Sequence, residues 1–235
     1  MLRIFIDFPK GSLFPCPRCG VRSKAYDTSE KQWRHLNFFQ YACYLTARVP
    51  RVECTEHGIL QAEVPWSRSG ADFTLLFESL AMTMVREMPV NAVSRIIGED
   101  DNKLWRMLRH YVAEARSRED YSSVSVIGID ETSAKKGHDY VTLVVDLEEK
   151  RTLFVAEGKD ASTIAKFKED LVTHNGVPDH ITDAAIDMSP AFIRGMETAF
   201  PNAAITFDKF HIMKILGAAV DEVRKKEIRE QEILR

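Results

Sequence analysis

The stretch "SVSVIGIDET", residues 123–132, places a run of apolar residues directly before two acidic ones. Branched apolar residues of this kind are typical of a buried strand, and this strand is expected to end at Asp130. A polar strand end that meets water would be an ordinary explanation. A carboxylate held on a rigid strand could instead bind a metal ion, so the rest of the sequence has to decide between these interpretations.

The residues around this strand predict a mixed α/β domain over residues 121–235. Further strands are expected at residues 140–146, 152–155, 180–186 and 203–207, and helices at residues 162–173, 190–200 and from Lys209 onward. Three consecutive strands followed by alternating helices and strands indicate a mixed sheet with helices packed on it.

A second acid, Asp187, ends another expected strand, in "HITDAAIDMSP". Ser189 and Pro190 then fit the N-cap and first residue of a helix. If the two strands are neighbours, the carboxylates of Asp130 and Asp187 meet at one edge of the sheet. Period-two alternation puts Gly128 on the Asp130 face, where it is expected to leave room beside the carboxylate. Paired carboxylates hold Mg²⁺, so these two acids predict a magnesium site.

Two short motifs, "CPRCG" and "CTEHG", carry potential metal ligands in the first quarter of the chain. The first contributes Cys16 and Cys19, and the second contributes Cys54 and His57. A glycine follows each second ligand, which suits the left-handed backbone of a tight turn. Three thiolates and one imidazole form a closed structural Zn²⁺ site, and with no recognisable secretion signal, metal binding is favoured over disulfides. Cys43, in an apolar run, is expected to be a core residue.

The first half of the chain predicts two small domains. Residues 1–64 predict a β-rich zinc-binding domain of short strands, because no long helical period is visible. Residues 65–120 predict three helices. The first is expected to be capped by Asp72, the second to end at Gly98, and the third to carry an apolar stripe. Two helices joined by a tight turn that contains glycine fit a helix-turn-helix.

Four cations give this helical domain a candidate DNA-binding face. Lys103, Arg106 and Arg109 lie off the apolar stripe of the third helix, and Arg95 lies on the preceding helix. A recognition helix needs such cations for phosphates and guanine edges. The alternative is the solvated face of an ordinary helical hairpin. Beside a zinc domain, DNA binding is the favoured interpretation.

The composition limits the classes of protein that fit. With 29% charged residues and no apolar run long enough to span a bilayer, no membrane partner is expected and a cytoplasmic location is the default. Residues 1–120 carry 17 Lys and Arg against 15 Asp and Glu, whereas residues 121–235 carry 15 against 20. A basic N-terminal part and an acidic C-terminal part fit a binding domain followed by a domain that uses carboxylates.

Five motifs, in order along nearly the whole chain, resemble the ISL3 family of bacterial insertion-sequence transposases: "CPRCG", "WRHLN", "PRVECTEHG", "GIDETSAKKGHDYVTLVVDLE" and "DMSPAFIRGMETAFPNAAITFDKFHIMK". The resemblance implies a zinc-binding domain, a helix-turn-helix and an RNase H-like domain with an Asp-Asp-Glu triad. It implies that Asp130 and Asp187 are the first two acids, and that Asp208 is a supporting acid. It also implies that the four Cys and His residues of the two short motifs are the zinc ligands.

The third acid of that family, a glutamate on a late helix beyond a helical insertion, has no match in this sequence. Glu222 and Glu227 lie on the last expected helix, but their surroundings do not resemble those of the family's glutamate. We therefore expect an N-terminal portion of a transposase, with a multi-domain α+β and α/β fold and an incomplete RNase H-like domain.

Two functions from different classes follow. The first is a transposase that binds the terminal inverted repeats of double-stranded DNA as a homo-oligomer and cuts and joins strands with Mg²⁺. The second is a non-catalytic DNA-binding repressor or regulator derived from a transposase. With either function, the chain is expected in the bacterial cytoplasm in association with the nucleoid. A nuclease-like fold without a DNA role is a third alternative. The missing glutamate favours the second function for this chain.

Overall fold

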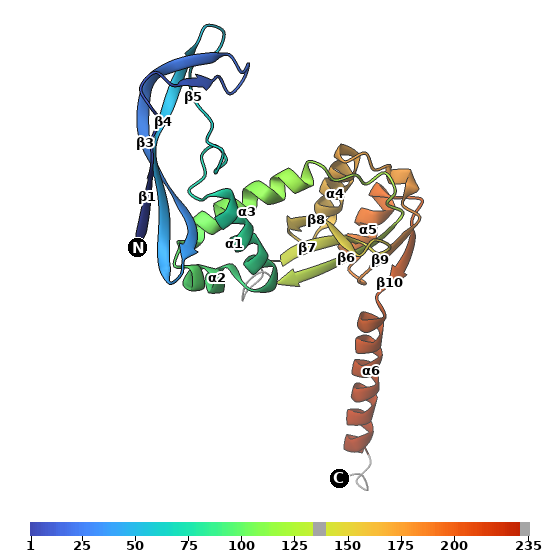
Figure 1. The fold of residues 1–235 in the computed structure, drawn as a ribbon. Helices are drawn as coiled ribbons and strands as arrows, with labels where there is room; N and C mark the ends of the chain where they lie inside the picture. The colour runs from blue at the N-terminus through green and yellow to red at the C-terminus, as the bar shows by residue number, and fades with distance from the viewer. Residues whose placement is uncertain (134–139, 231–235) are drawn as a thin grey trace. The chain divides into compact units, whose positions relative to one another are not determined.

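The structure is a computed structural model that describes residues 1–133 and 140–230. The chain divides into two compact units, Met1–Arg116 and Ser117–Arg235. The first holds a β-ribbon and three helices, and the second holds a five-stranded sheet with helices (Figure 1). None of the described helices has the length and apolar character that crossing a membrane requires.

The first unit is built on a long antiparallel hairpin. Its two strands are β3 (Arg22–Phe38) and β4 (Tyr41–Cys54), and shorter strands pair along them: β1 (Leu2–Ile6), β2 (Leu13–Pro15) and β5 (Gly58–Gln61). The expectation of short strands was wrong, since β3 has 17 residues and β4 has 14. The two strands stay paired along most of their length, through two register shifts.

Three helices follow the ribbon and share one core. They are α1 (Leu75–Glu87), α2 (Val90–Ile97) and α3 (Asp101–Arg116). Gly98 ends α2 with a left-handed φ of 69°, as predicted. The predicted cap of α1 was wrong. Thr74, two residues after Asp72, is the N-cap, and its side chain accepts the Phe77 amide. The Asp72 carboxylate instead pairs with Arg106.

A buried arginine joins the ribbon to these helices. Arg34 of β3 is 4% exposed, and its Nε lies 3.2 Å from Oε1 of Glu99 in the turn between α2 and α3. Its guanidinium also lies 4.8 Å from the centroid of the Phe77 ring. Its backbone pairs with Asp72 and Thr74. The hairpin and the helices are therefore packed together, so the ribbon fixes the orientation of the helices.

The second unit is a mixed α/β domain with the strand order β10-β9-β6-β7-β8. The strands are β6 (Val126–Ser133), β7 (Tyr140–Asp146), β8 (Arg151–Glu157), β9 (Asp183–Ile186) and β10 (Ala204–Phe207). Only β7 runs opposite to the others. This order is the RNase H-like arrangement that the resemblance implied. The strand expected from residue 180 begins later, because Pro178–His180 form a 3-10 turn.

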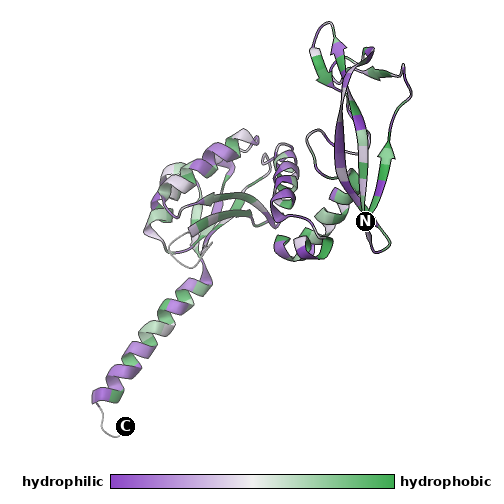
Figure 2. Cartoon of the chain, turned by 90° about the vertical axis from the view of Figure 1, so that its left-hand side faces the viewer, coloured by the Kyte–Doolittle hydropathy of each residue, from purple (hydrophilic) through white to green (hydrophobic). Residues whose placement is uncertain are grey.

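Helices α4 (Ala161–Thr173) and α5 (Pro190–Ala199) pack on the core side of this sheet. Buried apolar residues of the strands and of both helices form one cluster, which includes Ile127, Ile129, Val144, Ile164, Phe167, Phe192 and Met196. Gly195 of α5 lies so close to α4 that a Cβ there would be 2.9 Å from Cγ1 of Ile164. The last helix, α6 (Lys209–Glu230), has no buried residue, and apolar and polar residues alternate along it (Figure 2).

Candidate functional site

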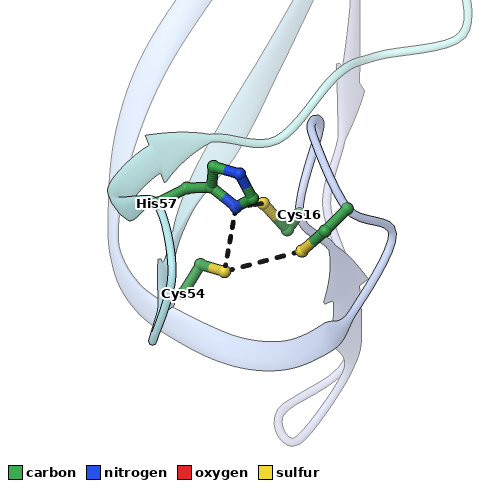
Figure 3. Close-up of side chains that lie close together, drawn as sticks. Cys16, Cys54 and His57 are labelled. Atoms are coloured by element: carbon green, nitrogen blue, oxygen red, sulfur yellow. Dashed lines mark hydrogen bonds between the residues drawn. The ribbon is translucent and has the colours of Figure 1, made fainter.

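The two ligand motifs meet at one end of the ribbon. Cys16 and Cys19 lie on the turn between β2 and β3, and Cys54 and His57 lie where β4 turns into β5. In Figure 3 the side chains of Cys16, Cys54 and His57 point toward one another. The four ligand atoms all lie within 4.8 Å of one another, and no other described residues form such a group of three or more.

The distances fit a tetrahedral metal site. The Sγ atoms of Cys19 and Cys54 are 3.6 Å apart, and Nδ1 of His57 lies 3.5 Å from Sγ of Cys54 and 3.9 Å from Sγ of Cys16. Zn–S bonds of about 2.3 Å and a Zn–N bond of about 2.0 Å place tetrahedral sulfurs about 3.8 Å apart and sulfur and nitrogen about 3.5 Å apart. The donor set and the spacing therefore both suit Zn²⁺, with Nδ1 as the histidine ligand atom.

The local backbone prepares the thiols for a cation. The amide groups of Cys19 and Arg18 donate toward the Cys16 sulfur and lower the pKa of that thiol. The Val21 amide acts in the same direction on Cys19, but burial and the neighbouring thiols of Cys54 and Cys16 outweigh it and raise the pKa of Cys19 overall. Thiolates this close repel one another, and a bound dication offsets that repulsion.

Two details of the zinc prediction are confirmed by the structure. Gly20 and Gly58 have φ values of 75° and 69°, the left-handed conformation that the tight turns require. Cys43 is 2% exposed in β4 and lies outside the four-residue group. It is a core residue, as the sequence indicated.

Three aspartates directly follow paired strand positions at one edge of the second sheet. In the parallel pairings, Ile129 of β6 is opposite Ile186 of β9, which is opposite Phe207 of β10. The residues that follow these three positions are Asp130, Asp187 and Asp208. The sequence predicted that the carboxylates of Asp130 and Asp187 would meet, and the structure puts the two residues after paired positions of neighbouring strands. It could not place Asp208 beside them, because the neighbour of β9 was not known.

Each of these carboxylates is held by a backbone amide. Asp130 accepts the Glu131 amide at 2.8 Å, Asp187 accepts the Ser189 amide, and Asp208 accepts the Phe210 amide at 2.9 Å. Oδ2 of Asp208 also lies 3.1 Å from Nδ1 of His211. The Phe210 amide and the His211 ring hold the pKa of Asp208 below its usual value. Ser189 is the N-cap of α5 as predicted, but its side chain makes no capping bond.

Two expectations about this edge were wrong. The strand does not end at Asp130, because β6 continues to Ser133 along β7. Gly128 does not leave room beside the carboxylate, since a Cβ there would lie 3.0 Å from the side chains of Val145 and Leu147. Glycine at residue 128 therefore lets the side chains of Val145 and Leu147 pack closely against β6.

The glutamates of α6 lie far from this edge. Helix α6 starts at Lys209, directly after Asp208, and has no buried residue. With a rise of 1.5 Å per residue, Glu222 lies roughly 20 Å and Glu227 roughly 27 Å along the helix axis from its start. The structure therefore does not bring either glutamate to Asp130 and Asp187.

The four candidate DNA-binding cations fall into two pairs. Nη2 of Arg106 lies 2.7 Å from Oδ2 of Asp72, and Nζ of Lys103 lies 3.5 Å from Oε2 of Glu99. Both are therefore engaged within the unit. Arg95 of α2 and Arg109 of α3 are exposed, and the described part of the chain offers them no ion-pair partner. The second pair is the more available for a partner molecule.

Comparison with known proteins gives matches along most of the chain. Residues 12–57 match the zinc-finger of transposase IS204/IS1001/IS1096/IS1165, and residues 62–112 match the helix-turn-helix domain of transposase family ISL3. Residues 127–234 match the transposase model of the same family, of the DDE type. The zinc match spans all four ligand residues, and Zn²⁺ is the structural cofactor of this ribbon.

Curated relatives are similar over nearly all of the chain. The transposase for insertion sequence element IS1557 from two strains of Mycobacterium tuberculosis is 28% identical over 214 residues, which cover 90% of this chain and 48% of the relative. The transposase for IS1001 from Bordetella parapertussis is 26% identical over 219 residues, with coverages of 92% and 53%. The chain thus spans about half the length of the curated relatives it matches.

Proposed function

The chain belongs to the ISL3 family of transposases, and on this basis we propose that it binds double-stranded DNA at the terminal inverted repeats of an insertion sequence. The observation that carries the proposal is the helix-turn-helix on its ribbon. Arg95 and Arg109 are exposed and form no ion pair within the described residues. The buried Arg34 holds the three helices α1, α2 and α3 on the hairpin. Helices held in a fixed orientation, with cations that have no protein partner, are suited to contact DNA phosphates and base edges.

We assign a role to each part of the chain. Residues 1–64 bind structural zinc through Cys16, Cys19, Cys54 and His57, and residues 65–120 form the helix-turn-helix. Residues 121–235 form the RNase H-like domain. Four protein ligands close the zinc coordination sphere and leave no position for a reacting molecule, so the zinc stabilises the fold. Engagement of both repeats of one element calls for a homo-oligomer, and DNA binding would hold the chain on the bacterial nucleoid.

Asp130 and Asp187 are the residues proposed to hold Mg²⁺. They offer hard oxygen ligands on neighbouring strands, and Mg²⁺ is usually bound by one or two carboxylates and several waters. Mg²⁺ held there would supply activation of the attacking oxygen and stabilisation of the leaving oxygen in phosphoryl transfer. The protein's part would be to hold both carboxylates for the metal, and the hydrogen bonds from the Glu131 amide to Asp130 and from the Ser189 amide to Asp187 support that role.

The second candidate function, a non-catalytic DNA-binding regulator, is favoured for this chain by one specific observation. Neither Glu222 nor Glu227 reaches the edge that carries Asp130 and Asp187. We therefore propose that residues 1–235 occupy transposon ends and cut them weakly or not at all. The transposase activity remains the proposal for a protein that supplies a third acid beside the first two.

The test measures binding of the full zinc-loaded chain to duplex DNA with and without an inverted repeat. The double variant Arg95→Gln/Arg109→Gln is expected to weaken binding and to flatten the salt dependence by about 0.9 for each phosphate that the variant no longer neutralises. Arg86→Gln, an exposed arginine of α1, is the control and should bind as the wild type does. Wild-type affinity and salt dependence in the double variant would contradict the proposed binding face.

A further inference from the structure

We infer that the zinc end of the ribbon is a second contact for the nucleic-acid backbone, distinct from the helix-turn-helix. Three residues carry it, namely Arg18, Arg22 and Lys24, called here the knuckle patch. The inference rests on the proposed DNA-binding function and extends it to a part of the chain whose role has so far been only structural.

The sequence segment that carries the knuckle patch is one-sided in charge. Between Asp7 and Asp27 the sequence has no acidic residue, whereas it holds Lys10 and the three cations of the patch. All four cations are exposed, and none of them forms an ion pair within the described residues. A run of solvated cations that form no ion pair is the electrostatic footprint expected of a nucleic-acid contact.

Other arginines of the same ribbon behave differently, which makes the contrast informative. Arg48 pairs with Asp7 at 2.7 Å, and Arg51 pairs with Asp27. Glu53 and Glu56 are acids near the zinc, yet neither forms an ion pair with the knuckle patch in the described structure. Arg48 and Arg51 of β4 are thus neutralised, whereas the knuckle patch has no ion pair within the described residues.

The backbone presents the knuckle patch on a rigid support. Arg22 and Lys24 alternate along β3 and so lie on one face, where β2 pairs with both positions. Arg18 lies inside the first ligand turn, which the hydrogen bond from the Gly20 amide to the Cys16 carbonyl holds in place and which bound zinc would brace further. Two residues along a strand span about 6.6 Å, close to two base-pair steps of about 3.4 Å, so both cations can follow one DNA strand.

The distance from the helix-turn-helix makes this a separate contact. Arg22 and Arg34 are both on β3, and twelve residues of strand extend about 40 Å. Arg34 lies at the helices and the knuckle patch lies at the zinc. Contacts at both ends of the ribbon would span about 12 base pairs of one duplex. The long hairpin, which a zinc site alone does not require, then has a role as a spacer.

The experiment measures the salt dependence of binding of the full zinc-loaded chain to a random-sequence duplex of about 40 base pairs. Phosphate contacts do not depend on sequence, so the target repeat is not needed. Arg22→Gln/Lys24→Gln is expected to lower the slope of log K against log salt by about 1.8, and Arg18→Gln by about 0.9. Arg3→Gln/Arg86→Gln removes the same charge from exposed positions of β1 and α1, and should leave the slope unchanged.

Two further variants make every outcome decisive. Arg22→Lys/Lys24→Arg keeps the charge and should restore the wild-type slope, while zinc per chain, measured on each protein, should stay the same. If Arg22→Gln/Lys24→Gln gives the same slope of log K against log salt as the control Arg3→Gln/Arg86→Gln, the inference is overturned. If Arg95→Gln/Arg109→Gln still weakens binding in that case, the proposed function stands alone. If the knuckle variants no longer self-associate while their salt slope for DNA binding is unchanged, the knuckle patch contacts a second copy of the chain instead of DNA. That result would also overturn the inference.

Discussion

Among single residues, the zinc ligands differ in how deeply they are buried. Cys16 and Cys54 are 3% and 5% exposed, whereas Cys19 is exposed. Cys54→Ser and Cys16→Ser are expected to lose most of the bound zinc and to unfold the ribbon end, because structural metal binding is coupled to folding. Metal analysis and thermal unfolding would measure both effects. Cys43→Ser is the control, since it changes a buried thiol outside the site and should keep full zinc.

His35 gives the ribbon a pH dependence of its own. Its Nδ1 lies 2.9 Å from Oγ1 of Thr74, and burial, with the nearby Arg34 charge, lowers the pKa of His35 below its usual value of 6.5. The unfolded chain therefore binds this proton at a higher pH than the folded chain. The contribution of His35 to the free energy of unfolding is fully present above pH 6.5, and it is lost as the pH drops through the lowered folded-state pKa.

The measurement compares thermal unfolding of the wild type and His35→Gln between about pH 8 and pH 5. The loss of stability toward acid pH should be smaller in the variant. Zinc release at low pH contributes equally to both proteins, so it cancels in the difference. Parallel pH profiles for the two proteins would show that His35 titrates alike in the folded and unfolded chains.

Among helices and strands, two glycines in helices make opposite predictions. Replacing a helical glycine by alanine favours the helix by about 1 kcal/mol. At Gly195 of α5, however, the new Cβ would lie 2.9 Å from the fully buried Ile164, and overpacking costs about 1–3 kcal/mol. Gly195→Ala should therefore destabilise the second unit. Gly217→Ala in α6, where nothing lies within 4 Å, should stabilise its helix.

Hydrogen exchange of α4, α5 and α6 would separate these effects, because it reports the stability of each helix. Faster exchange in α4 and α5 is expected for Gly195→Ala, and slower exchange in α6 for Gly217→Ala. Protection of α5 that rises in Gly195→Ala would show that α4 moves away at little cost.

Periodic patterns predicted most elements well, and the exceptions have physical reasons. The strand Tyr140–Asp146 and the start of the last helix at Lys209 are as predicted, because their apolar periods are clear. The length of β3 was missed, since its residues are mainly polar and its partner strand stabilises it. The pairing of Arg34 with Glu99 has no local signal, because residues far apart in sequence meet only in the fold.

The candidate site residues, like the helices and strands, could be predicted from the sequence only in part. Two matched ligand turns identified the zinc residues, since a metal site depends on spacing that sequence displays directly. The partners of Lys103 and Arg106 were not foreseeable, because surface charges find acids that tertiary structure brings near. The place of Asp208 beside Asp187 required the strand order, which sequence does not contain.

For the whole molecule, the prediction concerns strand cleavage. Incubation of the full chain with repeat-containing duplex and Mg²⁺ or Mn²⁺ is expected to give little or no nicking. The ion at the leaving oxygen normally needs another carboxylate, and losing one member of a group that acts together removes most of the rate. Robust nicking that Asp130→Ala abolishes would contradict this, and Asp208→Asn would then test whether Asp208 supplies the missing carboxylate.

The buried Arg34 also bears on how such proteins can be recombined. The helix-turn-helix would be poorly transferable between transposases by itself, because a residue of the preceding ribbon completes its core. A graft of residues 62–112 alone would remove the buried partner of Glu99 and leave only the more exposed Lys103 beside it, and breaking a buried pair costs up to about 5 kcal/mol. Shuffling by evolution or by design would therefore succeed when the ribbon and the helices are inherited as one block.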